Sequence, residues 1–198
     1  AEARGLVERA IVRVMTPGTV TEDECLDPDH PNYLTALLRE GQQTVIAAVD
    51  LSTGDTRLTP VSDLAAVRDE LARLEPREVL LCEDDADLLS LVRTVLPDTL
   101  INALTHERFD AQRTAHWLQE YFPTDGADAA FPPLGESTMG ALLGELEETH
   151  RSSLAHVRLP TLQTRSARLH LDHATRRNLE LVATLRGERR GSLLWVLD

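Results

Sequence analysis

The 198-residue sequence contains no lysine, only two cysteines and no long hydrophobic run. Cys25 and Cys82 are too few for a disulfide framework or a cysteine-rich zinc module. No apolar stretch approaches the roughly 18 residues of a membrane span, and no signal peptide is recognisable. All 20 basic residues are arginine, which we interpret as a genomic bias rather than a functional signal. These absences predict a cytoplasmic protein with no membrane partner, made of one domain or of one domain plus a fragment.

Charge is distributed unevenly along the chain, whose formal net charge is −13. Residues 1–150 carry 11 Arg and 29 acidic residues, a net charge of −18, whereas residues 151–198 carry 9 Arg and 4 acidic residues, a net charge of +5. A phosphate-binding surface requires clustered positive charge, so the first part is not expected to bind nucleic acid by itself. The arginine-rich end leaves direct DNA binding open, with a solvated helix face as the alternative.

Hydrophobic periodicity predicts a mixed sheet flanked by helices, an α/β fold. The predicted strands cover residues 10–15, 33–38, 44–51, 56–61, 78–82, 99–104 and 167–172. Helices are expected after caps at Ser62, at Asp84 or Asp85 and at Ser137, over 110–122 and over 174–185, with a loop at 126–135. In the predicted helix 110–122, the inward-facing residues are expected to be Ala111, Ala115, Leu118 and Phe122. In the predicted helix 174–185, they are expected to be Leu179, Val182 and Leu185.

One acidic motif suggests metal chemistry. Asp50 ends a strong strand and is followed by the small turn 52–54, and Glu83 or Asp84 follows a later strand. In a ribonuclease H-like nuclease, such carboxylates hold two divalent ions for phosphoryl transfer. Alternatively, Asp50 accepts hydrogen bonds from turn amides and Asp84 or Asp85 caps a helix, with no metal site. The spacing of the histidines does not match that of metal ligands, so it does not support a metal site.

Several segments resemble a known family in order and spacing. Residues 48–54 look like its "D-I-S-T-G" strand and turn, and residues 171–181 look like its "L-D-x-x-T-x-x-N-L-E-L" motif, which includes Asp172 and Asn178. The other similar segments are residues 12–19 with Thr16, Pro17 and Gly18, residues 32–36, residues 159–160 and residues 192–198. Together these segments resemble the MutS family of DNA mismatch repair proteins.

The resemblance implies a three-layer, ribonuclease H-like connector domain without nuclease activity at residues 20–158. Residues 1–19 would be the tail of the mismatch-recognition domain, and residues 159–198 a linker and the first segment of the core or lever domain. Because the chain lacks an initiating methionine, a mismatch-reading Phe-x-Glu motif and a Walker A loop, we expect a non-enzymatic fragment without cofactor. The intact parent would bind mismatched DNA and hydrolyse ATP, as a homodimer. The motif residues implied as structural are Thr16, Pro17, Gly18, Asp50, Gly54, Asp172 and Asn178.

The resemblance also implies a protein partner. The family's connector relays nucleotide state between domains and offers a surface to MutL, and the predicted helix 110–122 corresponds to an exposed connector helix. His116, Trp117 and Glu120 on that helix are therefore the expected docking residues. For Trp117 there is an equally weighted alternative, in which its ring folds down over the rim of the domain.

Overall fold

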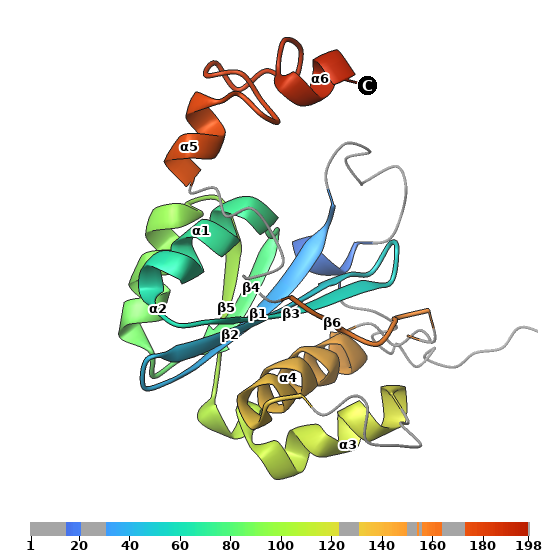
Figure 1. Cartoon of the computed structure of the whole chain (residues 1–198). Helices are drawn as coiled ribbons and strands as arrows, with labels where there is room; N and C mark the ends of the chain where they lie inside the picture. Colours follow the sequence, from blue (N-terminus) through green and yellow to red (C-terminus); the bar gives the residue numbers. More distant parts are fainter. Residues whose placement is uncertain are drawn as a thin grey trace, which may run out of the picture.

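The structure is a computed structural model that describes residues 15–20, 31–122, 131–149, 154, 156–163 and 173–197. The strands expected over 10–15 and 167–172 therefore fall outside the described residues, except for Met15, which lies in irregular structure. The described elements form a mixed sheet with helices on both faces (Figure 1). The predicted α/β fold is confirmed.

The sheet has six strands in the order β5-β4-β1-β2-β3-β6. Its strands are β1 (Tyr33–Glu40), β2 (Gln43–Asp50), β3 (Asp55–Val61), β4 (Glu78–Cys82), β5 (Leu100–Leu104) and β6 (Thr161–Leu162). The first three form antiparallel pairs, whereas β4 runs parallel to β1 and β5 parallel to β4. The short β6, which sequence periodicity did not indicate, pairs parallel with β3.

The central strands are hydrophobic along their whole length because helices cover both faces of the sheet. Successive side chains of β1 point to opposite faces, so Leu34 and Ala36 join one hydrophobic cluster while Tyr33 and Leu37 join the other. Cys82, at the end of β4, is buried and acts as a small apolar side chain.

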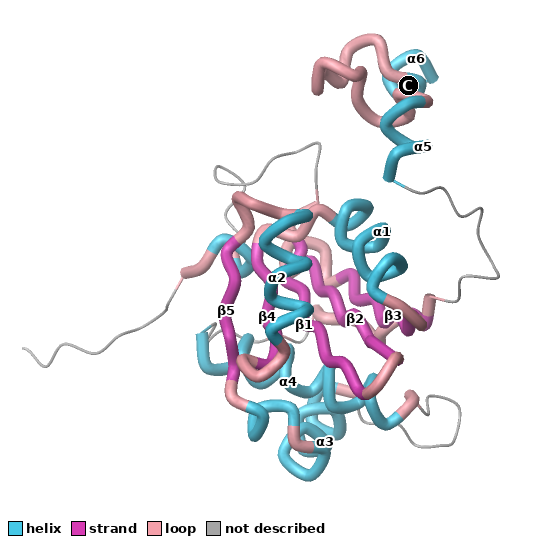
Figure 2. Tube along the Cα trace, turned by 90° about the vertical axis from the view of Figure 1, so that its left-hand side faces the viewer, coloured by secondary structure: helices cyan, strands magenta, loops and turns pink. Residues whose placement is uncertain are grey.

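Helices α1 (Leu64–Leu74) and α2 (Ala86–Val95) cover one face of the sheet (Figure 2). The N-cap of α1 is Asp63, whose Oδ1 accepts the Ala66 N–H at 2.8 Å, so the expected cap at Ser62 is wrong by one residue. Asp85 caps α2 by accepting the Leu88 N–H at 3.0 Å, which decides between the two expected caps.

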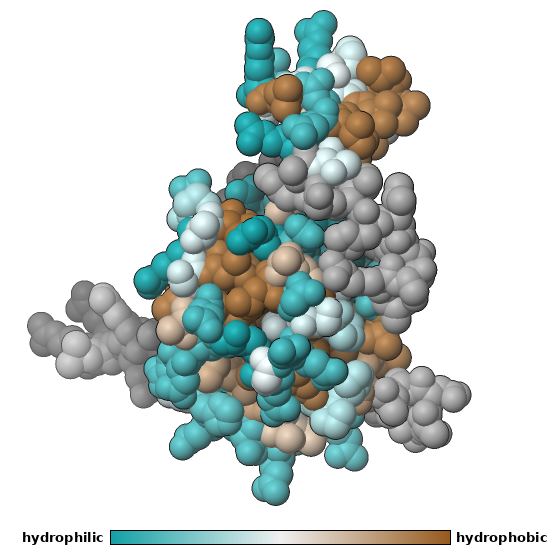
Figure 3. All heavy atoms as spheres, turned by 60° about the vertical axis from the view of Figure 1, so that its left-hand side comes forward, coloured by the Kyte–Doolittle hydropathy of each residue, from teal (hydrophilic) through white to brown (hydrophobic). Residues whose placement is uncertain are grey.

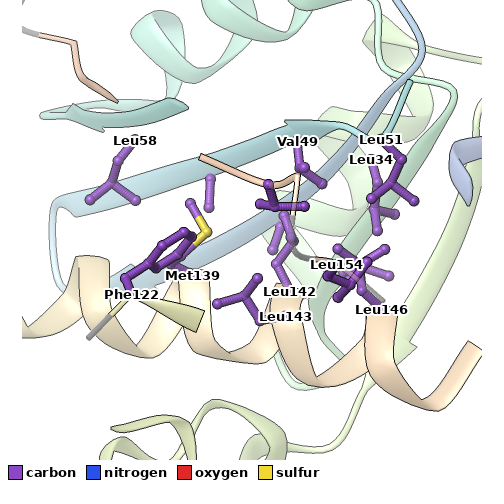
Figure 4. Packing of buried hydrophobic residues seen from close by; sticks show 14 of the residues in the cluster. Leu34, Val49, Leu51, Leu58, Phe122, Met139, Leu142, Leu143, Leu146 and Leu154 are labelled. Atoms are coloured by element: carbon purple, nitrogen blue, oxygen red, sulfur yellow. The ribbon is translucent and has the colours of Figure 1, made fainter. Parts of the chain in front are cut away.

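The opposite face is covered by α4 (Pro133–Thr149), which begins earlier than expected. The predicted cap at Ser137 is wrong, because Pro133 occupies the first position of the helix and Ser137 is buried inside it. The predicted loop 126–135 is wrong at residues 133–135, holds for residues 131–132, and lies outside the described residues before that. Its side chains interdigitate with those of the sheet in one core (Figure 4). The labelled members from α4 are Met139, Leu142, Leu143 and Leu146.

Helix α3 (Ala111–Tyr121) lies outside α4 and forms a further layer (Figure 1). Ala111 and Ala115 are exposed, so the predicted inner stripe is wrong at these two positions. The side chains directed at α4 and its core are those of Thr114, Trp117, Leu118, Tyr121 and Phe122. The inward-facing side of α3 therefore differs from the predicted one, because α3 packs against α4 rather than against the sheet.

Residues 173–197 contain two short helices, α5 (His173–Asn178) and α6 (Leu193–Leu197). The helix expected over 174–185 ends at Asn178, and Glu180 then adopts a left-handed backbone with φ 47°. Leu179 and Leu185 are 55% and 57% exposed, contrary to the prediction that they face inward. Figure 3 shows apolar side chains on the surface of this segment. Among the described residues, no helix is long and apolar enough to cross a membrane.

Candidate protein-docking site

Helix α3 begins where Asp110 caps its free backbone amides. The Asp110 Oδ1 accepts the N–H groups of Gln112 and Arg113 at 2.9 and 3.2 Å. An aspartate at this position also favours the helix electrostatically, because the N-terminal end carries partial positive charge. The cap therefore fixes the start of α3, and with it the direction in which each later side chain points.

The three predicted docking residues do not share one environment. The side chains of His116 and Glu120 are 70% and 51% exposed, and His116 Nε2 lies 3.3 Å from Glu120 Oε2 across one helical turn. Trp117 is half-buried, and its ring stacks on Tyr121 with centroids 6.5 Å apart. A Cβ on Gly144 of α4 would lie 2.9 Å from the Trp117 Nε1. The structure thus places His116 and Glu120 on the outer surface and folds Trp117 down onto α4.

Ion pairs of Arg108 hold the base of α3 against α4. The guanidinium of Arg108, just before α3, lies 2.9 Å from Glu145 and 2.5 Å from Glu148 of α4. Burial raises the pKa of Glu145, although the neighbouring Arg108 opposes the rise. These contacts tie the start of α3 to the C-terminal half of α4.

A second polar contact joins the other end of α3 to the same helix. The Tyr121 hydroxyl lies 3.2 Å from Glu147 Oε2 and donates to it. Burial, together with the nearby Glu147 carboxylate, raises the pKa of Tyr121 to about 12. The outward face of α3 therefore stands on a base that is fixed at both ends.

Asp50 is a turn-capping residue in the structure. Its carboxylate is buried, and Oδ1 accepts both the Ser52 N–H at 2.9 Å and the Ser52 hydroxyl at 2.6 Å. The Gly54 N–H donates to the Asp50 carbonyl at 2.8 Å, and Gly54 has φ +71°. A Cβ on Gly54 would lie 2.2 Å from the His156 carbonyl oxygen, so this position requires glycine. This is the structural alternative foreseen for the motif.

The nuclease alternative has no support in the structure. Asp50 pairs with Tyr33 at the start of β1, whereas β4 pairs with β1 as far as Leu37, opposite Leu81, and Glu83 and Asp84 follow β4 beyond that level. At least four residues of strand separate the two levels, about 13 Å or more at roughly 3.3 Å per residue. Two-metal sites hold their ions about 4 Å apart. Within the described residues, no group of three or more His, Cys, Asp or Glu side chains could hold a metal ion.

The remaining motif residues are placed as follows. Thr16 precedes the 3-10 helix η1 (Pro17–Thr19), and its N–H donates to Thr19 Oγ1 at 2.9 Å. Gly18 is buried and donates its N–H to Glu78 Oε2 at 3.0 Å. Asn178 is the exposed last residue of α5, and Asp172 lies outside the described residues.

Sequence analysis missed the role of Glu78. Its carboxylate, only 1% exposed, also accepts the Asn102 side-chain N–H at 2.6 Å. The one available signal was a charged residue at the start of an otherwise apolar strand, because a buried charge needs dedicated donors.

Comparison with known proteins assigns the family. The sequence model of MutS domain II matches residues 32–158. The DNA mismatch repair protein MutS of Desulfosudis oleivorans is 36% identical over 204 residues, covering 100% of this chain and 23% of the relative. That of Dinoroseobacter shibae is 38% identical over 200 residues, covering 99% and 22%, and that of Acaryochloris marina is 36% identical over 214 residues, covering 100% and 24%. The chain spans about a quarter of these relatives and belongs to the MutS family of DNA mismatch repair proteins, with MutS domain II at its centre.

Proposed function

We propose that this chain is the connector module of a mismatch repair protein. In this proposal it relays ATP and mismatch state between the domains on either side, and it docks MutL on the outward face of α3. The parent protein binds mismatched DNA and hydrolyses ATP as a homodimer, while the connector itself has no catalytic role and binds no cofactor or metal. The family assignment supports the mismatch repair context.

The position of α3 is the observation that carries the docking proposal. Its inner face is held on α4 by close helix packing and by the Tyr121–Glu147 hydrogen bond. Its outer face presents His116 and Glu120 to solvent from a rigid base. Binding residues supported by a fixed scaffold lose little conformational entropy when a partner binds. The net charge of −18 over residues 1–150 further favours a protein partner with a positive surface.

A binding titration tests the docking surface. The chain is titrated with the amino-terminal domain of MutL from the same organism at physiological salt, using isothermal calorimetry. We expect the His116→Ala/Glu120→Ala variant to bind at least about fivefold more weakly, as truncation of central interface residues does. Arg93→Ala is the matched control, because Arg93 is exposed on α2 at the opposite face of the sheet.

The outcomes separate the two parts of the docking proposal. Unchanged affinity of the double variant contradicts α3 as the docking face. Equal weakening by Arg93→Ala, which makes the chain more negative and so cannot weaken binding to a positive partner through overall charge, would mean that the loss is not specific to α3 and would also contradict the assignment. The absence of binding by the unsubstituted chain contradicts MutL docking by this module alone.

Trp117→Phe is measured alongside, and we expect it to change stability more than affinity because the ring contacts Gly144 and Tyr121.

A further inference from the structure

The segment that enters the domain is attached through a buried carboxylate. Glu78, the first residue of β4, accepts the Gly18 N–H on one oxygen at 3.0 Å and the Asn102 side-chain N–H on the other at 2.6 Å. Because both oxygens have a donor, the orientation of the carboxylate is fixed. Glu78 thus connects η1 to both β4 and β5.

The backbone of η1 also touches the sheet directly. A Cβ on Gly18 would lie 2.8 Å from the Glu78 Cβ and 3.1 Å from the Leu34 Cβ, closer than such atoms approach. The Asn32 side chain donates to the Val20 carbonyl at 3.2 Å and adds a second attachment. The incoming segment therefore sits on the edge of the sheet at which β1 begins.

The segment that leaves the domain is attached at the same edge. The Arg158 N–H donates to the Gly54 carbonyl at 3.0 Å, and the Thr56 hydroxyl donates to the Arg158 carbonyl at 2.6 Å. The His156 Nε2 lies 2.8 Å from the Leu51 carbonyl oxygen. These bonds hold residues 156–158 against the turn that follows β2.

Tyr33 links the two attachments. It lies between Asn32 and Leu34 in the chain and opposite Asp50 in the β1–β2 register. Its hydroxyl donates to Asp55 Oδ2 at 3.3 Å, and the Arg57 guanidinium lies 5.3 Å from its ring centre. The incoming segment contacts the two chain neighbours of Tyr33, and Tyr33 itself pairs with Asp50 and bonds to Asp55, on either side of the turn that holds the outgoing segment.

We propose that these two attachments form one coupled joint, with Glu78 as the positioning residue of the incoming segment. Release of either segment loosens the other, because the incoming segment contacts the beginning of β1 and this part of β1 pairs with the end of β2, whose turn holds the outgoing segment. This rests on the relay function proposed above and assigns its transmission to named residues. Coupling between two sites is reciprocal by thermodynamic necessity, so the proposal can be tested from both ends.

Amide hydrogen exchange of this chain, followed by NMR, measures the coupling. Glu78→Gln retains the shape and removes the charge: the Gln oxygen still accepts the Gly18 N–H, while its NH2 faces Asn102, whose side-chain amide can turn to accept it. We expect the Gly18 amide to exchange about tenfold faster, since a hydrogen bond to a charged group is replaced by a weaker neutral one. The Arg158 amide should exchange severalfold faster, while the Ala36 and Leu80 amides in the strand centres remain unchanged.

The reciprocal variant acts on the outgoing segment. Thr56→Val removes the bond to the Arg158 carbonyl. It should accelerate exchange at Arg158 directly and, through the same coupling, severalfold at Gly18. The matched control is Arg39→Gln, which breaks the 2.6 Å ion pair with Asp85 at the opposite edge of the sheet and should change neither amide.

Two results would overturn the proposal. Faster exchange at Gly18 with unchanged exchange at Arg158 means that the ends are independent, and uniform acceleration including Ala36 means that Glu78 only stabilises the fold. If Glu78→Gln does not fold, exchange of the Gly18 and Arg158 amides is compared in Asn102→Ala instead. This substitution removes the second donor to Glu78 without touching η1, and the same two results would overturn the proposal. No MutL is present in this experiment, so a failure of docking and a failure of coupling are recognised separately.

Discussion

Gly140 of α4 lies directly against Thr114 of α3: a Cβ on Gly140 would be 2.2 Å from the Thr114 Cβ and 2.7 Å from its carbonyl oxygen. One turn later, Gly144 leaves room for the Trp117 ring in the same way. The two glycines bring α3 close enough to α4 for side chains to interdigitate without voids. The outer layer of the domain, and thus the proposed docking face, depends on this contact.

Substitution at the two glycines should have unequal effects. Gly140→Ala should lower the free energy of unfolding by about 1–3 kcal/mol despite a gain in helix propensity of about 1 kcal/mol, because the clash involves the Thr114 backbone. Gly144→Ala should be milder, because its first contact is the movable Trp117 side chain. Urea unfolding measures both, and a larger loss for Gly144→Ala would contradict the expected order.

Thr35 and Thr56 provide a matched pair of buried hydroxyls. Within the described part of the chain, Thr35 Oγ1 has no hydrogen-bond partner, whereas Thr56 Oγ1 donates to the Arg158 carbonyl at 2.6 Å. We expect Thr35→Val to raise the free energy of unfolding by about 1 kcal/mol, and Thr56→Val to lower it by about the same amount. Thermal unfolding of the two variants gives the sign, and a destabilised Thr35→Val would show that its hydroxyl has a partner.

Tyr121 should make stability depend on alkaline pH. Its folded pKa of about 12 exceeds the ordinary value of 10, so the folded state retains the proton more tightly than the unfolded state. The stabilisation is complete below pH 10 and is lost as the pH rises toward 12. Tyr121→Phe should therefore lose less stability than the unsubstituted chain over this interval. Equal pH dependence of the two proteins, measured by urea unfolding, would contradict the assignment, and tyrosinate absorbance reports the ionisation directly.

Substitution of Arg108 should lower the free energy of unfolding more at neutral than at acidic pH. Burial already raises the pKa of Glu145, and Arg108→Met removes the nearby cation that opposes the rise. A carboxyl group with a raised folded pKa favours folding below its unfolded pKa, and this contribution is lost as the pH rises through the folded value. We expect Arg108→Met to lower stability by about 1.5–3 kcal/mol at neutral pH and by less in acid.

A double variant serves as the control for Arg108. Arg108→Met/Glu145→Leu removes both groups, so no unpaired carboxylate is buried, and it should recover much of the lost stability. The measurement is urea unfolding at several pH values. A loss in Arg108→Met that is independent of pH, or no recovery in the double variant, would mean that Arg108 acts through packing rather than through charge.

Residues 173–197 should open more readily than the sheet. Eight large apolar side chains in this segment are exposed, and the one residue described as buried there is Ser192. A segment with so little buried surface has a low local free energy of opening. Amides of α6 should therefore exchange orders of magnitude faster than those of β1. Comparable protection in the two elements, measured by mass spectrometry, would contradict this expectation.

Local sequence patterns were sufficient for the sheet. Strands β1 to β5 were predicted within one or two residues, because each is a short apolar or alternating run bounded by turn residues. The cap of α2 was narrowed to Asp84 or Asp85 and the start of α3 was predicted at Asp110, since a capping aspartate acts on amides two or three residues away. These features depend on neighbours in the chain.

Predictions failed where distant segments decide the structure. The inner face of α3 follows from glycines of α4 about 26 residues later, and the end of α5 at Asn178 from a chain reversal at Glu180. His116 and Glu120 are exposed on α3 as expected, whereas the inward turn of Trp117, which the sequence left open, depends on Gly144. The domain limits and the docking partner remain predictions.

By itself, the sequence determined the α/β class, the strands and the turn around Asp50, because periodicity and turn chemistry are local properties of the chain. Only the tertiary structure decided that Asp50 and Glu83 lie at opposite ends of the sheet's strands. It also decided that Glu78 binds Gly18 and that the turn after β2 binds Arg158. These relationships arise when parallel strands that are distant in sequence are brought into register. Packing of the whole chain sets that register, and no short motif encodes it.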